Sequence, residues 1–399
     1  MDAVQLTTAL KEEARKQGFD LVGVCPAVTP PRIEHLRRWL AAGHAGQMRY
    51  LADRAAAYEH PCHVLEGVQS LMMLGMVYRT VEPQPPGEGE GRVSRYAWGI
   101  DYHDLVRERL RCLAEVHTRL APQARVRGVV DTAPLLEREF AQLAGLGWIG
   151  KNTLLLNRRM GSWFFLAALL TTERLEYDQP QAEGYCGSCR ACLDACPTGA
   201  LVDAHCLDAR KCISYLTIEL RGSIPRELRE PAGAWLFGCD VCQEVCPWNR
   251  GAPITLWRGL PTTPQQGEIT PHQGAPVSAV HALHPLPGMN PVGLDGLFAL
   301  DEAAFRERFR GTPLWRARRR GLLRNAAIVL GNRSHEAAIP GLVRGLNDAE
   351  PMVRGACAWA LGRYRAEPAG AALRERLAVE DDGEVRREIE SSLGDSRDC

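Results

Sequence analysis

The chain has 399 residues, of which 48 are lysine or arginine, 48 are aspartate or glutamate, and 45% are hydrophobic. This is the composition of a globular protein with several domains, and it excludes a disordered polyelectrolyte or a fibrous repeat. Since the formal net charge is zero, binding of nucleic acid would require a local basic patch.

The first 174 residues predict a mixture of helices and strands. An amphipathic helix with early acidic residues opens the chain, where a signal peptide would have an apolar core. A second helix is expected at residues 135–143, and the longest apolar run, residues 163–170, is shorter than the ~18 residues of a membrane span. Strands are expected at residues 21–24, 71–78 and 126–130. We therefore expect a cytoplasmic protein with no membrane partner.

Nine of the 14 cysteines lie between residues 186 and 246. In a chain without an export signal, such crowding favours metal binding over disulfides. The first spacing, Cys-x2-Cys-x2-Cys-x3-Cys-Pro, is that of bacterial ferredoxins, and a Cys-x2-Cys-x3-Cys-Pro motif follows it. The two motifs predict two 4Fe-4S clusters, which transfer single electrons from an external low-potential donor. The alternative, structural zinc, does not require the second Cys-Pro motif.

In two-cluster proteins the cysteine before the proline usually ligates the other cluster. This crossing assigns to the first cluster Cys186, Cys189, Cys192 and Cys246. It assigns to the second cluster Cys196, Cys239, Cys242 and one further thiolate. The candidates for that last position are Cys206 and Cys212.

Residues 301–399 are rich in arginine, alanine and leucine and predict helices. A Val-Arg pair followed by a Leu-Gly pair occurs at residues 353–362 and recurs at residues 385–394, and another Leu-Gly pair occupies residues 330–331. Paired-helix repeats of the HEAT type have roughly this period, and each repeat buries its apolar face against its neighbours. The chain thus predicts an α+β multidomain protein. Its predicted parts are an N-terminal α/β domain (1–174), a ferredoxin-like module (175–255), an irregular connection (256–300) and HEAT-like repeats (301–399).

Several segments along the chain carry a more specific pattern than the cysteine spacing. They are YAWGIDYH (96–103), DTAP (131–134), GLGWIGKN (145–152), GSWFF (161–165), ISYLTIE (213–219), FGCDVCQEVCPWNR (237–250), FRGTPL (309–314) and RRRGLLRN (318–325). Together they closely resemble the epoxyqueuosine reductase family. The resemblance runs from about Gly18 to the helical repeats, so it covers nearly the whole chain.

The resemblance implies reduction of the epoxide of epoxyqueuosine to the alkene of queuosine at the wobble position of tRNA. It also implies a base-off cobalamin, held between the ferredoxin-like module and an N-terminal domain similar to reductive dehalogenases and nitroreductases. The Asp-x-His-x-x-Gly signature of cobalt-ligating histidines is not completed after Asp101, so no protein histidine is expected on cobalt. In this family Cys212, and not Cys206, matches the fourth ligand of the second cluster.

The resemblance matches Asp131 to the family's proton donor. An acid near the epoxide oxygen lowers the barrier to C–O cleavage, and we expect burial behind the strand at 126–130 to raise the pKa of Asp131. The alternative is that Asp131 caps the following helix. For His103 the alternatives are a proton relay and a packed, hydrogen-bonded histidine. Cobalamin contacts are expected from Tyr96, Asp131, Lys151, Asn152, Ser162, Ser214 and Asp240.

An arginine-rich segment precedes the repeats. At helical spacing Arg316, Arg320 and Arg324 share one face, with Arg319 near them. Such a stripe suits the phosphates of a tRNA anticodon stem-loop, whose wobble nucleotide would be splayed into the cobalamin pocket. The alternative is a solvated face paired with nearby acidic residues. We expect a monomer.

Two other functions share the cluster motifs. A cobalamin-dependent reductive dehalogenase of small molecules would have no use for the arginine stripe or the repeats, and usually carries an export signal. A ferredoxin-type electron carrier would leave most of the chain without a task.

Overall fold

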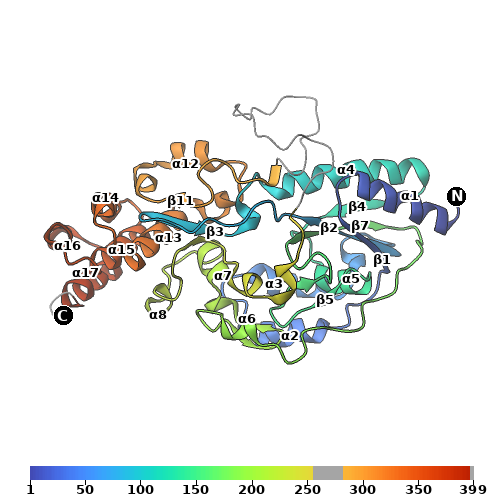
Figure 1. Ribbon diagram of the computed structural model, residues 1–399, viewed down its shortest axis with the longest axis horizontal. Coiled ribbons are helices and arrows are strands. Elements are labelled where there is room, and N and C mark those ends of the chain that lie inside the picture. The colour runs from blue at the N-terminus through green and yellow to red at the C-terminus, as the bar shows by residue number, and fades with distance from the viewer. Residues whose placement is uncertain (255–281, 396–399) are drawn as a thin grey trace.

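The structure is a computed structural model that describes residues 1–254 and 282–395, with the N-terminal sheet at one end of the long axis and the C-terminal repeats at the other (Figure 1). The α-helices are α1 (Ala3–Lys16), α2 (Ile33–Ala41), α3 (Arg49–Asp53), α4 (Tyr102–Leu120), α5 (Glu137–Leu143), α6 (Ala191–Asp194), α7 (Ile213–Ile218), α8 (Arg226–Arg229), α9 (Val241–Glu244), α10 (Pro247–Arg250), α12 (Glu302–Phe309), α13 (Arg318–Asn332), α14 (Ile339–Leu346), α15 (Pro351–Leu361), α16 (Glu367–Val379) and α17 (Gly383–Asp395). The strands are β1 (Leu21–Pro26), β2 (Ser70–Val77), β3 (Glu90–Val93), β4 (Val126–Val129), β5 (Trp148–Ile149), β6 (Leu155–Leu156), β7 (Phe164–Thr171), β8 (Leu201–Asp203), β9 (Cys206–Leu207), β10 (Trp235–Phe237) and β11 (Val292–Gly293). Within the described ranges, none of these helices combines the length and apolarity that a bilayer crossing requires.

The N-terminal sheet has the order β1-β2-β7-β4, and each neighbouring pair is antiparallel. Every residue of β2 is buried, because side chains alternate between the two faces of a strand and both faces are covered. Met72 and Leu74 pack with α1 and α4, whereas Leu71 and Met73 pack on the side of α5. The predicted strands and the helix after residue 134 are confirmed. The apolar run at 163–170 forms β7, a strand that its lack of alternation had hidden.

A second sheet joins three distant parts of the chain. Strand β3 pairs in parallel with β10 of the cysteine-rich region and antiparallel with β11, which precedes the repeats. Val93 and Trp98 accordingly share one hydrophobic core with Phe237 and with residues of the repeats. The limits of the predicted domains remain a prediction, but residues 90–98 pack outside the N-terminal sheet. Much of the predicted irregular connection, 256–300, lies outside the described residues, and its described part contains β11 and a short 3-10 helix, η5 (Asp295–Ala299).

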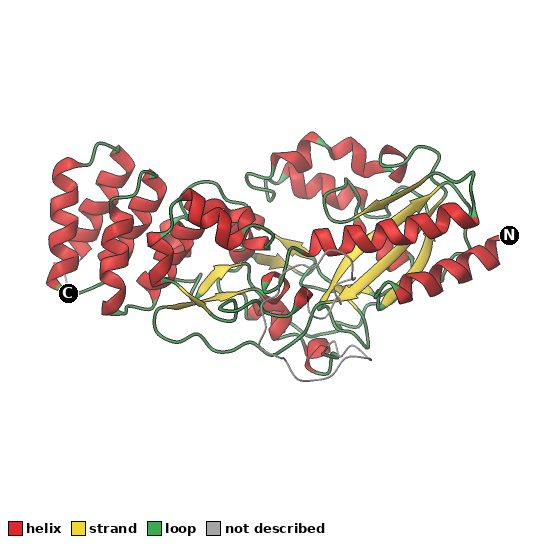
Figure 2. Ribbon diagram, turned by 90° about the horizontal axis from the view of Figure 1, so that it is seen from above, coloured by secondary structure: helices red, strands yellow, loops and turns green. Residues whose placement is uncertain are grey.

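The C-terminal repeats stack helix against helix (Figure 2). Two of the three glycines of the repeated Leu-Gly pairs, Gly331 and Gly362, lie at close contacts between successive helices, whereas Gly394 has open space around it. A Cβ atom on Gly331 would come within 2.5 Å of the Trp359 ring, and one on Gly362 within 2.6 Å of Ser392. The repeat predicted from the sequence is therefore confirmed, and glycine recurs because it alone leaves room for the neighbouring helix.

Arg324, predicted as a tRNA contact, is a buried structural residue with 1% of its surface exposed. Its guanidinium donates hydrogen bonds to the main-chain oxygens of Leu216 (2.6 Å), Leu220 (2.8 Å) and Gly222 (2.5 Å). It thereby ties α13 of the repeats to α7 and the turn that follows. The prediction failed because helical spacing does not tell which face of a helix is covered.

Arg324→Ala is expected to lower the free energy of unfolding by about 3 kcal/mol, because three buried carbonyl oxygens lose a charged donor. Arg320 is the matched control, since it is exposed and lies 3.7 Å from Glu350. Arg320→Ala should change the free energy by less than about 0.5 kcal/mol. Urea unfolding followed by circular dichroism measures both variants. Equal midpoints for the two would contradict the structural role.

Candidate active site and cluster sites

The four cysteines predicted for the first cluster line one cavity of about 270 Å³. Cys186 and Cys189 come from the loop before α6, Cys192 lies on α6, and Cys246 comes from the segment between α9 and α10. Pro247 and Trp248 close the same cavity. The crossing of one cysteine from the second motif to the first group therefore agrees with the structure.

The second group of cysteines consists of those predicted for the second cluster, and one of them, Cys242, lies on α9. Burial raises the pKa of Cys239, and the neighbouring thiols of Cys212 and Cys196 raise it further. Burial also raises the pKa of Cys242, and the neighbouring thiols of Cys239 and Cys212 raise it further. The thiol of Cys212 acts on both Cys239 and Cys242, so Cys212 is the candidate that lies with the group.

Aromatic rings enclose the first cysteine group. Trp148 is 1% exposed and packs edge-on against Tyr185 and Trp248, with ring centroids 5.0 Å and 5.1 Å away. Its Nε1 is buried without a hydrogen-bond partner, in a cluster of residues that includes Cys246. Such an unpaired donor fits a site whose acceptor is a bound group. Among the described residues, no three His, Cys, Asp or Glu side chains are placed to hold a single metal ion.

Asp131 lies at the carboxyl end of β4, directly beyond the sheet. Its φ of 28° is in the left-handed region, and Thr132 N donates back to the oxygen of Val130 in a tight turn. A non-glycine residue with such a backbone stores strain, which is common at functional sites. The side chain does not cap α5, whose first residue is Glu137, so the capping alternative is excluded. The turn instead directs the Asp131 carboxylate toward α4.

Two residues at the start of α4 hold the Asp131 carboxylate. His103 Nε2 lies 2.7 Å from Asp131 Oδ1, and the Tyr102 hydroxyl donates to Asp131 Oδ2 at 2.5 Å. The other imidazole nitrogen, Nδ1, lies 2.6 Å from Asp101 Oδ1. His103 is 1% exposed, whereas the Asp131 side chain is 37% exposed. The histidine is thus buried between two carboxylates, and Asp131 is the member of the group that solvent or a substrate can reach.

The expectation that the pKa of Asp131 lies above its ordinary value is wrong. Burial does act in that direction, but hydrogen bonds from His103 and Tyr102, the charge of His103 and that of Arg316 hold the pKa below its ordinary value. For His103, burial lowers the pKa, and the hydrogen bonds to Asp101 and Asp131 outweigh it and raise the pKa. The proton of this pair therefore lies on the imidazole, and Asp131 rests as a carboxylate.

Residues that the sequence did not single out lie near Asp131, together with two predicted residues, Arg316 and Tyr96. Burial, Glu219, Tyr58 and Asp131 together raise the pKa of Tyr50 to about 12, which places these groups near one another. Arg316 Nη2 lies 2.7 Å from His103 Nε2, so a residue predicted for tRNA reaches the Asp131–His103 pair. Tyr96 packs edge-on against Tyr102 at 6.1 Å. Tyr50 belongs to the GQMRYL segment, but nothing in its spacing indicated a functional role.

Four of the seven side chains predicted to contact cobalamin are instead hydrogen-bonded within the protein. Lys151 Nζ donates to the oxygens of Gly187 and Cys189, in the loop of the first cysteine group. The other three polar side chains that are engaged within the protein are Asn152, bonded to Cys242 O; Ser162, bonded to Asn249 and Gln243; and Asp240, bonded to Ser94 and Arg95. These four residues join the cysteine-rich region to residues of the N-terminal region. The remaining members of the predicted set are Tyr96, Asp131 and Ser214.

The predicted arginine stripe is not one surface. Arg318 has a φ of 60° and separates a 3-10 helix, η6 (Pro313–Ala317), from α13, so Arg316 and Arg320 do not share a helix. Arg319 pairs with Asp348 and donates to Leu300 O. Of the four predicted residues, only Arg320 is exposed.

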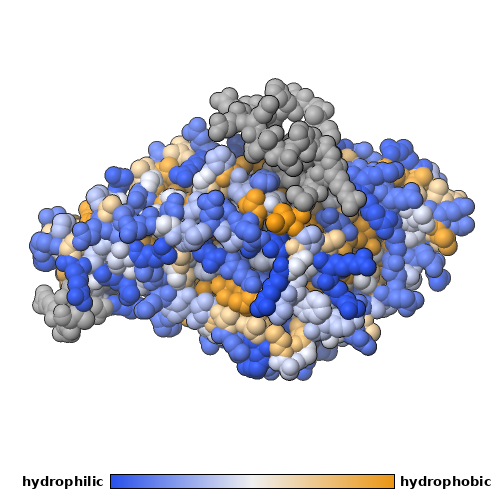
Figure 3. Space-filling view, viewed as in Figure 1, coloured by the Kyte–Doolittle hydropathy of each residue, from blue (hydrophilic) through white to orange (hydrophobic). Residues whose placement is uncertain are grey.

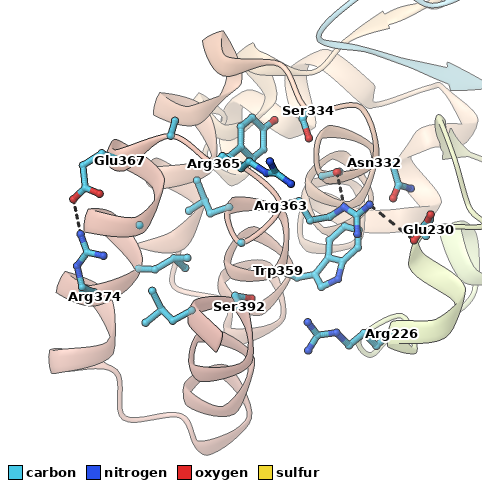
Figure 4. Close-up of a pocket in the computed structure, with 18 residues that line it drawn as sticks. Arg226, Glu230, Asn332, Ser334, Trp359, Arg363, Arg365, Glu367, Arg374 and Ser392 are labelled. Atoms are coloured by element: carbon cyan, nitrogen blue, oxygen red, sulfur yellow. Dashed lines mark hydrogen bonds and ion pairs between the residues drawn. The ribbon is translucent and has the colours of Figure 1, made fainter. Parts of the chain in front are cut away.

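Another group of arginines lines a cavity of about 830 Å³ between α8 and the repeats (Figure 4). Arg363 is bonded to Gly331 O and lies 3.9 Å from Glu230, and Arg374 pairs with Glu367. The remaining arginines of this cavity are Arg226 and Arg365. On the face shown in Figure 3, hydrophilic side chains cover most of the surface and apolar ones gather near the middle of the molecule.

Comparisons with known proteins agree with this organisation. Residues 59–132 match the family described as "Epoxyqueuosine reductase QueG, DUF1730", residues 185–249 match "4Fe-4S double cluster binding domain", and residues 316–394 match "HEAT repeats". The epoxyqueuosine reductase of Pseudomonas aeruginosa is 40% identical over 91% of this chain and 96% of its own length, and that of Escherichia coli is 36% identical over 91% and 90%. A crystal structure of epoxyqueuosine reductase with an epoxyqueuosine-modified tRNA-Tyr stem loop superposes with a TM-score of 0.85 at 30% identity, covering 98% of this chain and 99% of that one.

Asp101→Asn is expected to move the titration midpoint of His103 to lower pH, because one of the two carboxylates that stabilise the imidazolium is lost. Asparagine remains a good N-cap, so α4 should still begin at Tyr102. Histidine-selective NMR titration measures the midpoint. Asp104→Asn is the control, since Asp104 lies on the same turn, is exposed and pairs with Arg107. A shift of equal size in both variants would contradict the assignment.

Proposed function

Because the chain belongs to the epoxyqueuosine reductase family, we propose that it reduces the epoxide of epoxyqueuosine in tRNA to the alkene of queuosine. The observation that carries the proposal is the Asp131–His103 pair: a proton-holding imidazole buried behind a carboxylate that is open to a substrate. Within this proposal, residues 1–174 supply the catalytic residues, residues 175–255 the clusters, and residues 301–399 much of the tRNA-binding surface.

The two cysteine groups support a pair of 4Fe-4S clusters, which supply electrons one at a time when bound. The first cluster would be held by the cavity-lining thiols Cys186, Cys189, Cys192 and Cys246. The second would be held by Cys196, Cys212, Cys239 and Cys242. The match to a double-cluster domain over residues 185–249 supports the same assignment. Lys151 would fix the loop of the first cluster through its hydrogen bonds to Gly187 O and Cys189 O.

Base-off cobalamin, without a histidine on cobalt, is the further cofactor that we propose from the family resemblance. Its cobalt would supply a centre that receives two electrons and acts on the C–O bond. Of the predicted contacts, Tyr96, Asp131 and Ser214 fit, because their side chains are at least partly exposed. The engaged side chains of Lys151 and Asp240 do not fit as direct contacts.

The reaction itself fixes what the protein must provide. Two C–O bonds of the epoxide break, a C=C bond forms, and the oxygen leaves as water after taking up two protons and two electrons. His103 would hold the first proton at Nε2, 2.7 Å from Asp131 Oδ1. Asp131 would receive this proton and pass it to the substrate oxygen. Tyr102 would orient the carboxylate through its hydrogen bond to Oδ2.

The tRNA would approach the same place from the side of the repeats. Arg316 lies within the site, and exposed Arg318 and Arg320 follow it along the chain. Guanidinium groups bind phosphates in a salt-dependent manner and without reading the sequence. Tyr50 is 46% exposed near Asp131, and an exposed aromatic ring suits stacking of an unpaired base.

The function is tested by nucleoside analysis of epoxyqueuosine-containing tRNA after incubation with the reconstituted protein, cobalamin and a low-potential reductant. We expect queuosine to appear. Asp131→Asn should keep tRNA affinity but lower the rate by about 100-fold or more, the usual range for loss of an acid catalyst. Unchanged epoxyqueuosine with the unaltered protein would refute the function, whereas full activity of the variant would refute the role of Asp131.

The ligand assignment is tested by iron and sulfide analysis of two cysteine variants. Cys212→Ser is expected to lose the second cluster and with it about half of the iron, since oxygen is a poor substitute for thiolate in such clusters. Cys206→Ser is the matched control, because Cys206 lies in the same region and should leave the iron content unchanged. The reverse result would exchange the two residues in the assignment.

A further inference from the structure

Arg316 connects the C-terminal region to the Asp131–His103 pair. Its Nη2 lies 2.8 Å from Nδ1 and 2.7 Å from Nε2 of His103. Each imidazole nitrogen has a single in-plane position, which holds either a proton or a lone pair. Asp101 occupies this position at Nδ1, at 2.6 Å, and Asp131 occupies it at Nε2, at 2.7 Å. The contact of Arg316 with the imidazole is therefore a contact between charges and not a third directional hydrogen bond.

The backbone that carries Arg316 is fixed to the start of α4. The main-chain N–H of Asp101 donates to the oxygen of Gly311 at 2.7 Å, two residues before η6 begins. Within η6, Leu314 is fully buried, and Arg221 donates to the main-chain oxygen of Arg316 at 2.9 Å. Arg316 as a whole is half-buried. Its side chain, and not its backbone, is therefore the part that can change partners.

The charges of the four side chains in contact balance. Asp101 and Asp131 are negative, whereas Arg316 and the protonated His103 are positive. Two positive groups in contact repel each other, and the carboxylates on the two imidazole nitrogens compensate for this repulsion. Burial lowers the pKa of His103, the hydrogen bonds to Asp101 and Asp131 raise it, and the charge of Arg316 lowers it again. An anion that binds Arg316 would remove this last effect, so the pair would keep its proton to higher pH.

Further titratable groups face the pair from neighbouring elements. Burial raises the pKa of Tyr96 and Tyr102 above the ordinary range and that of Tyr50 to about 12, so all three stay neutral near pH 7. On α5, burial and the charge of Asp131 raise the pKa of Glu137 to about 8. The variants below leave these four residues unchanged, so a difference between variants reports on the arginine alone.

A phosphate is the anion that the surroundings of Arg316 favour. Arg318 and Arg320 are exposed and follow it along the chain. A guanidinium group binds a phosphate through two parallel hydrogen bonds, and several arginines close together suit a chain of phosphates. The phosphodiester backbone of a nucleic acid is therefore the ligand class that fits this segment.

We propose that Arg316 is a positioning residue that couples the binding of tRNA to the proton of the Asp131–His103 pair. In the free protein the guanidinium rests against the imidazole. A phosphodiester next to the wobble nucleotide pairs with Arg316 and offsets its charge, which leaves the imidazolium with the two carboxylates. The pair then holds its proton until Asp131 passes it to the oxygen of the bound substrate. Arg316 itself gives up no proton. This inference rests on the proposed function.

Histidine-selective NMR titration of the reconstituted protein tests the coupling without turnover. The probe is an RNA anticodon stem-loop with guanosine at the wobble position. We expect the RNA to raise the titration midpoint of His103 by roughly 1 pH unit. Arg316→Gln should raise the midpoint of the free protein by a similar amount, and RNA should then add little. Arg316→Lys keeps the charge and should restore the midpoint of the unaltered free protein.

Arg320→Gln is the matched control, since Arg320 is exposed and lies 3.7 Å from Glu350. This variant should bind RNA more weakly, yet at saturating RNA it should show the same midpoints as the unaltered protein. An unaltered protein whose His103 midpoint does not respond to RNA would overturn the inference. A response of the same size in Arg316→Gln would overturn it as well, because the RNA would then act on His103 without the arginine.

The pH dependence of turnover separates this role from a structural one. The profile of kcat/KM reports the free protein, and that of kcat reports the complex with substrate. In the unaltered enzyme, the alkaline limb of kcat should therefore lie roughly 1 pH unit above that of kcat/KM. In Arg316→Gln the two limbs should coincide, with a raised KM. Coinciding limbs in the unaltered enzyme would overturn the inference and leave the proposed function intact, whereas failure to make queuosine would overturn the function.

Discussion

The pairing of β3 with both β10 and β11 is the constraint on which the arrangement of the molecule depends. These hydrogen bonds join a segment of the N-terminal region to the cysteine-rich region and to the start of the repeats. The shared core that forms around β3 brings side chains from three parts of the chain to one place. Arg316 can therefore reach His103 across more than 200 positions of sequence, with Arg324 anchoring the repeats behind it.

The chemistry of the site depends on which of its side chains, Asp131 or His103, carries the proton. Asp131 is open to solvent but is held ionised by its partners, whereas His103 is shielded and its pKa is raised by the carboxylates beside it. Such a division is physically reasonable, because a carboxylate in contact with the substrate can accept and release a proton repeatedly if proton-bearing groups stand behind it. The strained backbone of Asp131 serves the same arrangement, since the turn directs the carboxylate toward Tyr102 and His103 of α4.

The sequence predicted those features that depend on local spacing and missed those that depend on distant partners. The helical repeat is confirmed, and the four cysteines predicted for the first cluster line one cavity, because ligand spacing and helix contacts impose a short-range pattern on the chain. The predicted direction of the Asp131 pKa shift was wrong, because the residue that lowers this pKa most, His103, lies on another element, α4. The arginine stripe was wrong for a related reason: periodicity fixed neither the break at Arg318 nor the covered face that contains Arg324.

The close packing at Gly331 and Gly362 also has a mechanical consequence. With no room for a side chain between neighbouring helices, the angle between α13 and α15, and that between α15 and α17, can hardly vary. The C-terminal part then behaves as a stiff arm clamped at its base by the anchoring arginine. A wedge as small as one methyl group at Gly331 would tilt everything beyond it, so the outermost helix would swing farthest.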